Sequence, residues 1–208
     1  MPRLQIASSE GGKSQIDPEE LLQRARDGDM RVGRLMFDRY QSLVNRRVRR
    51  VLGRDREHDD IVQNVFMAVF RGLASVNEPR SLDFWVLGIT HNTILRELRR
   101  RKFRWPWTKR EPEILDLVDD TASSADALET RQLLDRTYSA LKQLPARQHL
   151  AYTLSILEER PLAEIATACA CSLATVKREI TDARARLRRL VERDPVLSEY
   201  LRSIEEGR

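Results

Sequence analysis

The chain has 208 residues, of which 33% are charged and 41% hydrophobic, enough for one or two modest domains with hydrophobic cores. Its 37 Lys and Arg against 32 Asp and Glu give a net charge of +5, which permits nucleic-acid binding without requiring it. There is no long apolar run and the N-terminus is polar, so we expect neither a membrane-spanning segment nor a signal peptide. Two basic blocks, residues 16–104 and 130–194, flank an acidic stretch at 105–129.

The first two predicted helices follow a polar N-terminal segment. Residues 1–15 are rich in Ser and Gly, and we expect them to be disordered. Asp17 and Pro18 predict an N-cap and a first helical residue, with the helix ending near Gly28. A second helix is predicted from about Met30 to a break at residue 53. Its outer face is expected to be basic through Arg46, Arg47, Arg49 and Arg50.

Two further helices are predicted at residues 56–72 and 81–102, separated by a loop at residues 74–80. In the first, the apolar stripe turns the opposite face outward, and that face carries Asp60 and Gln63. The second ends in more cations than the negative C-terminal end of a helix needs. They predict a phosphate-contacting surface, with a merely solvated charged face as the alternative. These cations are Arg99, Arg100, Arg101 and Lys102.

Residues 105–127 interrupt the helical pattern, because Pro106 and Pro112 prevent a regular helix. The stretch is also acidic, and it predicts an extended linker. Helical periodicity resumes over residues 128–141, and Pro145 starts another helix. The chain is therefore divided into two helical parts.

A helix–turn–helix pattern at residues 161–190 is the most specific stretch of the sequence. Its helices are separated only by residues 170–172, and Ser172 is placed to cap the second helix at Thr175. The apolar stripe of that helix comprises Leu173, Val176, Ile180, Ala183, Leu187 and Leu190. Because such a unit can insert its second helix into the DNA major groove, the opposite face is a candidate DNA-binding surface; an ordinary helical hairpin is the alternative. That face carries Thr175, Lys177, Arg178, Thr181, Arg184 and Arg188.

Few residues suggest catalysis or metal binding. Cys169 and Cys171 are poorly placed for a disulfide with each other and too few for a zinc site. We expect them to be small core residues in a reducing compartment, with a redox switch as the alternative. His58, Asp59 and Asp60 form the one acid–histidine cluster, but side chains on successive helix faces make a poor metal site. We therefore expect no enzymatic activity, no cofactor and no metal.

Three groups of short motifs follow one another along the chain. The first contains LMFDRY at residues 35–40 and DDIVQNVF at residues 59–66. The second contains LDFWVL at residues 82–87, and the third contains LPARQ at residues 144–148 and EIA at residues 164–166. In this order, the motifs resemble those of the extracytoplasmic-function (group 4) sigma factors of bacterial RNA polymerase.

The resemblance implies an all-α fold of two small helical domains joined by a flexible acidic linker. Residues 16–104 would form the region-2-like bundle, residues 105–127 the linker and residues 128–194 the region-4-like helix–turn–helix domain. Residues 1–15 precede them, and the C-terminal tail, residues 195–208, could form one more weak helix. The implied protein is a cytoplasmic, non-enzymatic initiation factor that directs core RNA polymerase to promoters. The alternative is a stand-alone helix–turn–helix regulator that binds DNA without polymerase.

The resemblance also implies partners and site residues. The first domain would dock on the clamp helices of the largest polymerase subunit through Asp59, Asp60, Gln63 and Asn64. It would also recognise and melt the promoter −10 element through Asn77, Arg80, Ser81, Trp85, His91, Asn92, Arg99, Arg100 and Arg101. The second domain would contact the flap of the second-largest subunit, and it would bind the −35 element through Thr175, Lys177, Arg178, Thr181, Asp182 and Arg184. An anti-sigma factor is a further implied partner, and no membrane insertion is implied.

The predicted DNA-binding helix departs from the family at Glu179 and Asp182, where the family often has Arg. A carboxylate there is repelled by phosphate but can accept a hydrogen bond from cytosine N4. We therefore expect an unusual −35 preference. For Asp182, an ion pair with Arg178 or Arg186, each four residues away on the helix, is the alternative.

Overall fold

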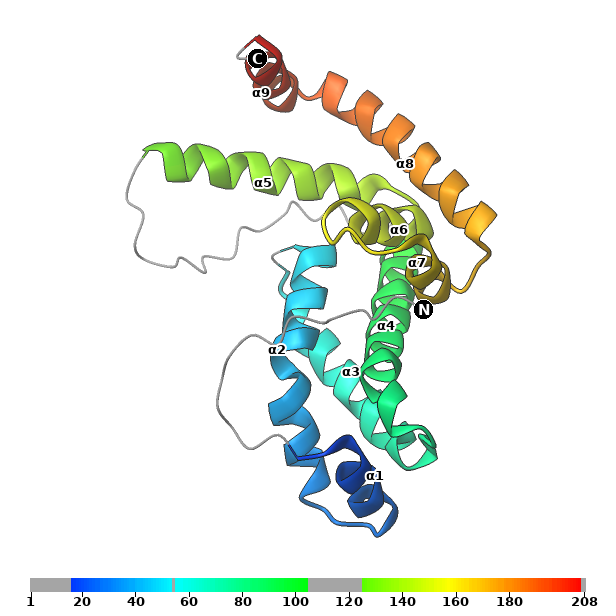
Figure 1. The fold of residues 1–208 in the computed structure, drawn as a ribbon. Coiled ribbons are helices and arrows are strands. Elements are labelled where there is room, and N and C mark those ends of the chain that lie inside the picture. Colours follow the sequence, from blue (N-terminus) through cyan, green and yellow to red (C-terminus); the bar gives the residue numbers. More distant parts are fainter. Residues whose placement is uncertain (1–15, 54, 105–124, 207–208) are drawn as a thin grey trace.

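The computed structural model describes residues 16–53, 55–104 and 125–206. In these residues all regular secondary structure is α-helix or 3-10 helix, so the described fold is all-α (Figure 1). The predicted fold class is therefore confirmed. The expectations for residues 1–15 and for most of the linker lie outside the described residues. Within the described part of the chain, no helix is both long and apolar enough to cross a bilayer.

In the N-terminal half, the described residues 16–53 and 55–104 form a bundle of four helices close to the predicted positions. The Asp17 carboxylate accepts a hydrogen bond from the backbone N–H of Glu19 at 3.1 Å and so caps the first helix, as predicted. The two central helices and the long fourth helix pack against one another through their apolar stripes. The helices are α1 (Pro18–Arg26), α2 (Val32–Leu52), α3 (His58–Gly72) and α4 (Leu82–Arg104).

The described part of the C-terminal half, residues 125–206, contains five helices. They are α5 (Ala125–Gln143), α6 (Ala146–Ile156), α7 (Leu162–Cys169), α8 (Leu173–Arg193) and α9 (Pro195–Glu206). The first three residues of helix α5 thus fall within the predicted linker, and the predicted tail is helical as far as Glu206. The Asp194 carboxylate caps α9 by accepting from the backbone N–H groups of Val196 and Leu197 at 3.0 and 3.1 Å.

The predicted helix–turn–helix is present in α7 and α8. Ser172 Oγ accepts from the backbone N–H of Thr175 at 3.2 Å, and Ala170 takes the left-handed conformation at φ +50° that ends α7. The predicted apolar stripe of α8 is buried at its centre, but Leu173 is 50% exposed. The first turn of α8 extends past the helices that cover the rest of the stripe (Figure 1), so the prediction that Leu173 is buried is wrong.

The two halves pack together, which no sequence pattern predicts. Helices α6 and α7 lie against α2 and α4 (Figure 1). One consequence is that Arg47, predicted on the outer face of α2, instead pairs with Glu158 in the turn after α6 and is only 12% exposed. A single hydrophobic core includes Val51 and Leu52 of α2, Leu95 and Leu98 of α4, Leu150 and Leu154 of α6, Ile165 and Cys169 of α7, and Val176 and Ile180 of α8.

Two histidines are buried where the halves meet. His149 of α6 is 1% exposed and its Nε2–H donates to the Val51 carbonyl at 2.8 Å, while His91 of α4 is 9% exposed. Burial lowers the pKa of each to about 4; for His91 the nearby Arg47 and Arg160 act in the same direction. Both side chains are therefore neutral at pH 7.

Stability should fall as the pH drops from 7 to 5. The unfolded chain binds protons on these histidines near pH 6.5, whereas the folded chain does so only near pH 4. Each histidine should therefore lower the free energy of unfolding by roughly 2 kcal/mol at pH 5 relative to pH 7. Urea unfolding at the two pH values checks this, and His149→Gln, whose amide can still donate to Val51, should remove about half of the change. An equal pH dependence in that variant would contradict the assignment.

Candidate nucleic-acid and protein interfaces

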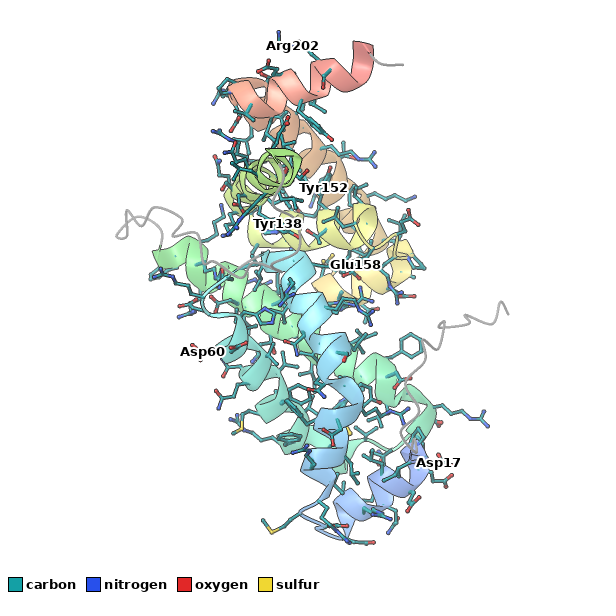
Figure 2. The ribbon with its side chains drawn as sticks, turned by 90° about the vertical axis from the view of Figure 1, so that its left-hand side faces the viewer. Asp17, Asp60, Tyr138, Tyr152, Glu158 and Arg202 are labelled. Carbon is teal, nitrogen blue, oxygen red and sulfur yellow. The ribbon has the colours of Figure 1, made fainter. Side chains whose placement is uncertain are left out.

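An open groove between α2 and α3 is lined by two of the four predicted polymerase-docking residues, Asp59 and Gln63. Asp60 of α3 lies on the outer side of the bundle (Figure 2), and Asp59, Gln63 and Asn64 are likewise exposed. The groove has a volume of about 460 Å³ and is lined by Phe37, Asn45, Asp59, Val62, Gln63, Phe66, Met67 and Phe70. Because the apolar stripe of α3 is buried against α2 and α4, the opposite face of α3, which carries these polar residues, points outward.

The groove also contains exposed apolar side chains that were not among the predicted site residues. Phe37, Met67 and Phe70 are 38%, 44% and 40% exposed. The Phe66 ring lies between Phe37 and Phe70, with ring centroids 4.8 and 5.9 Å apart. In the sequence, Gln63, Phe66 and Phe70 are spaced three and four residues apart, which places them along one edge of a helix. This spacing could have predicted an aromatic surface beside the docking residues. An exposed apolar surface bordered by polar groups is typical of a protein-docking site.

The acid–histidine cluster at the start of α3 has a structural partner. His58 Nε2 lies 2.8 Å from Asn45 Oδ1 of α2, so this imidazole donates to a neighbouring helix. Among the described residues no group of three His, Cys, Asp or Glu side chains could hold a metal ion. The cluster therefore contributes to the packing of α3 on α2.

The loop between α3 and α4 presents the first of the predicted −10 residues. Two short 3-10 turns, Leu73–Ser75 and Pro79–Ser81, border Asn77, which is exposed. The loop is anchored because Arg26 of α1 donates to the Val76 carbonyl at 2.9 Å. Asn77 is thus held at the surface by a supported loop, next to exposed Arg80 and half-buried Ser81.

Three predicted −10 residues of α4 lie at different depths. Trp85 is partly buried, because its indole ring covers Gly72, where an added Cβ would lie 2.8 Å from Trp85 Cζ2. Asn92 is exposed, as a DNA contact requires. His91 is buried beneath the C-terminal half of the chain and reaches no solvent-facing surface in this conformation, which contradicts the expectation of an accessible residue.

The arginines at the end of α4 form ion pairs with neighbouring acids. Arg101 pairs with Asp55 and Glu97, and Arg100 pairs with Glu97 at 2.8 Å and with Glu57 at 2.9 Å. Although burial opposes ionisation of Asp55 and Glu97, these arginines hold the pKa of both carboxyls below the usual range. Arg99 is exposed. Two of the three predicted phosphate contacts are therefore engaged within the chain.

Helix α8 presents the predicted −35 residues on one exposed face. Lys177, Arg178, Thr181, Asp182 and Arg184 are exposed, and Thr175 is half-buried. The Thr181 hydroxyl donates to the Lys177 carbonyl at 3.0 Å, so it lies along the helix surface. Because Val176, Ile180 and Ala183 are buried on the opposite side, this face is fixed outward.

The two acids of α8 have different surroundings. Glu179 is half-buried and lies 3.7 Å from Arg147 of α6, within its own half of the chain. Asp182 is exposed and forms no ion pair with any described residue, so the alternative to base contact, an ion pair with Arg178 or Arg186, is absent from the described structure. Asp182 remains available for an external partner.

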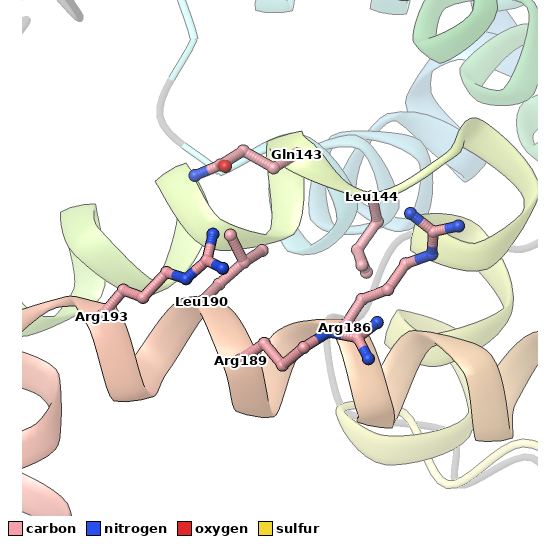
Figure 3. Close-up of a pocket in the computed structure, with 6 residues that line it drawn as sticks. All are labelled: Gln143, Leu144, Arg186, Arg189, Leu190 and Arg193. Carbon is pink, nitrogen blue, oxygen red and sulfur yellow. The ribbon is translucent and has the colours of Figure 1, made fainter.

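A second groove continues the basic surface of α8 toward its C-terminal end (Figure 3). It has a volume of about 230 Å³ and lies between α5 and α8. Near its edge, Lys102 of α4 donates to the Gln143 carbonyl at 2.7 Å. Burial lowers the pKa of Lys102, and the charge of Arg186 lowers it further. The lining residues are Gln143, Leu144, Arg186, Arg189, Leu190 and Arg193.

Family models match both halves of the chain. The model of Sigma-70 region 2 matches residues 36–104, and the model of Sigma-70, region 4 matches residues 134–187. The α3 groove and the −10 candidates thus fall in the first match, and the exposed face of α8 falls in the second. No curated protein matches the chain.

Solved structures show the same fold, with 16 matching chains. One is CnrH in complex with the cytosolic domain of CnrY, with a TM-score of 0.56 and 22% sequence identity over 86% of this chain and 99% of that chain. Another is the sigma factor RpoE in complex with the anti-sigma factor NepR from Bartonella quintana, with a TM-score of 0.54 and 20% identity over 79% of this chain and 99% of that one. At these identities the likeness establishes the fold.

Proposed function

The chain belongs to the sigma-70 family as a sigma factor of the extracytoplasmic-function type, which directs transcription initiation, and we propose that it uses the α3 groove, α4 and α8 for this task. The observation that carries the proposal is that the two matched regions expose surfaces of different chemistry. An apolar groove with an acidic edge lies on region 2, and a basic helix face lies on region 4. These surfaces suit a protein and DNA respectively.

Core RNA polymerase is the proposed occupant of the α3 groove. Phe37, Met67 and Phe70 would be buried against the clamp helices, while Asp60 and Gln63 would face their basic side chains. Such an interface combines an apolar centre with a polar edge. The acidic first turn of α3 would also orient the approach of a basic partner.

Promoter opening is assigned to the loop before α4. Asn77 can hydrogen-bond to the edge of an unstacked base, and the exposed Phe84, 52% exposed on the first turn of α4, offers an aromatic face on which a base can stack. Arg80 lies beside them as an exposed cation for the phosphate backbone. The loop would therefore hold a −10 base outside the duplex.

The −35 element is assigned to α8. Its capped N-terminal end would enter the major groove, with Lys177, Arg178, Thr181 and Asp182 near base edges and Thr175 and Arg184 near phosphates. Asp182 would accept a hydrogen bond from cytosine N4, because a carboxylate repelled by phosphate needs a compensating donor.

Replacing Asp182 by Ala should relax the base preference at one −35 position. A base contact of this kind discriminates by roughly 1–3 kcal/mol, while removal of the negative charge should leave non-specific DNA affinity equal or higher. Binding selection on a library randomised over the −35 element measures both. Glu192→Ala, on the last turns of α8 where the acid pairs with Arg188, is the matched control. The same base profile for Asp182→Ala and the control would reject the contact.

An anti-sigma factor is a proposed partner. RpoE, one of the similar structures, was solved in complex with the anti-sigma factor NepR. The exposed surfaces of this chain that would bind polymerase could equally be covered by such a regulator. The inducing signal would then act through that partner.

A stand-alone DNA-binding regulator is the competing function, and association with polymerase separates the two. On size-exclusion chromatography with core RNA polymerase, a sigma factor should co-elute as a stable holoenzyme, whereas a stand-alone regulator should elute separately. The α3 groove favours the former, because an exposed apolar groove with a polar edge is typical of a protein-docking site.

A further inference from the structure

The groove between α5 and α8 is lined by three arginines that are not among the residues assigned to the −35 element (Figure 3). Arg186, Arg189 and Arg193 recur at intervals of three and four residues, so they form one row along α8. At about 100° per residue, this row lies roughly 80° around the helix from the centre of the residues assigned to −35 base edges. The row is therefore a second cationic surface, on the side of α8 that adjoins the DNA-facing one.

The charges of these three arginines are not compensated within the described part of the chain. All three side chains are exposed, and none forms an ion pair with a described residue. The two acids beside Arg193 in the sequence have other partners. Glu192 pairs with Arg188 at 3.0 Å, and Asp194 pairs with Arg136 at 2.9 Å. The row therefore remains available for an external anion.

A further cation crowds the same place. Lys102 of α4 donates to the Gln143 backbone carbonyl at 2.7 Å near the edge of the groove. Burial lowers the pKa of Lys102, and the charge of Arg186 lowers it further. Among the described residues that line the groove none is acidic, so these like charges repel one another without relief. A bound anion would remove that repulsion.

The lining favours a phosphate backbone over a protein as the occupant. Leu144 is 1% exposed and Leu190 is half-buried, so the groove offers little apolar surface, whereas the α3 groove exposes three large apolar side chains. A protein-docking site needs an apolar centre. A DNA backbone is instead bound by guanidinium groups and amides, and the exposed Gln143 side chain adds such an amide.

The dimensions of the row also suit a DNA strand. Arg186 and Arg193 are seven residues apart, or about 10 Å along the helix at 1.5 Å per residue. A strand of duplex DNA carries one negative charge per about 3.4 Å of its axis, so the row can follow a strand past several phosphates. Arg186 lies one turn beyond Asp182, the last residue assigned to a base edge. The row thus begins where the proposed base contacts end.

We propose that the groove between α5 and α8 binds the phosphate backbone of the promoter duplex beside the −35 element, through Arg186, Arg189 and Arg193 and with the Gln143 amide as a further donor. These contacts add affinity whatever the sequence and fix the position of α8 on the duplex. This inference rests on the proposed function, because the groove lies beside duplex DNA only when α8 occupies the −35 element.

The combined replacement Arg186→Gln, Arg189→Gln and Arg193→Gln tests the proposal in the reconstituted holoenzyme. It removes three charges from exposed positions, so the helical circular dichroism spectrum should be unchanged. The slope of log affinity against log salt concentration should become shallower by about 2.7, for three phosphates at about 0.9 each. Raising the salt concentration from about 50 to about 200 mM should then cost the wild type roughly 40-fold more affinity than it costs the variant.

Two control variants separate charge in the groove from other effects. Lys at the same three positions keeps the cations, so that variant should retain most of the salt dependence. Arg202→Gln removes an exposed cation from α9, outside the groove, and should match the wild type.

Neutral methylphosphonate linkages, introduced one at a time around the −35 element, locate the contacted phosphates. In the wild type, neutralisation at a few positions beside the element should weaken binding. The triple Gln variant should be insensitive at those same positions, because it lacks the partner of the missing charge. Selection on a library randomised over the −35 element should give the same base profile for both proteins.

Equal salt slopes in the wild type and the triple Gln variant, or no phosphate to which the variant is less sensitive, would overturn the inference. A changed −35 base profile would also overturn it, by making the arginines base-reading groups. So would a loss of affinity for core polymerase, which would make the groove a protein interface. A wild-type holoenzyme with no preference among −35 sequences would reject the proposed function itself, and the inference with it.

Discussion

Replacement of Asp60 by Arg together with Gln63 by Ala should lower the affinity of the chain for core RNA polymerase by about 100-fold. The substitutions reverse the charge of exposed Asp60 and delete the amide of Gln63, which lines the groove between α2 and α3. A reversed charge at a desolvated interface typically costs about 2–5 kcal/mol, and each 1.4 kcal/mol is a factor of ten in affinity. Fluorescence titration with core polymerase measures the dissociation constant.

The control for this experiment is Glu129→Arg, which makes the same charge reversal on exposed α5. It should bind core polymerase about as tightly as the wild type, since its site is outside region 2. The Asp60 and Gln63 side chains are exposed and outside the core, so the helical spectrum should be unchanged. Wild-type affinity in the double variant would remove α3 from the polymerase interface.

Replacement of Lys177 and Arg178 by Ala should lower affinity for the preferred −35 sequence by roughly 100-fold, since specific contacts of this kind contribute about 1–3 kcal/mol each. Both side chains are exposed in the first turns of α8, just after the Ser172 cap. Plotted against the logarithm of the salt concentration, the logarithm of the affinity falls with a slope of about −0.9 for each phosphate contacted. Loss of two cations should therefore reduce the magnitude of this slope by up to about 2. Promoter-DNA titrations with holoenzyme at several salt concentrations test both effects.

Arg193→Ala supplies the matched comparison on the last turn of α8. It removes a cation at the far end of the same helix, about 24 Å from Lys177 at 1.5 Å per residue. Its −35 preference should match that of the wild type. If the Lys177 and Arg178 variant lost affinity equally for all sequences, α8 would contact DNA only through phosphates.

Local sequence signals predicted the helices well, because the residues that start a helix, form its apolar stripe and end it lie close together in the sequence. Asp17 caps α1, Ser172 caps α8, and Gly53 ends α2 with φ +73°. Each of these depends on residues within a few positions, and the structure places them as expected. The exposure of the α3 and α8 faces followed from the same stripes, since buried Val65 and Val176 turn their opposite faces outward.

Contacts between distant parts of the chain were not predictable in this way. Arg47 and Glu158 each look like ordinary surface charges, and only the packing of α6 on α2 buries them together. Likewise, Arg101 stood in a run of cations that suggested phosphate binding, but Asp55 lies beside it in the fold. His91 occupied a plausible outward position on α4, yet the region 4 half covers it.

The central claim is that this chain gives core RNA polymerase its promoter specificity. The most direct test reconstitutes core polymerase with the chain, transcribes a library of genomic DNA fragments and sequences the 5′ ends of the RNA. We expect transcripts that depend on the chain, start downstream of one shared pair of −10 and −35 sequences, and disappear with the variant that combines Asp60→Arg and Gln63→Ala. Transcripts that are the same with and without the chain would contradict it.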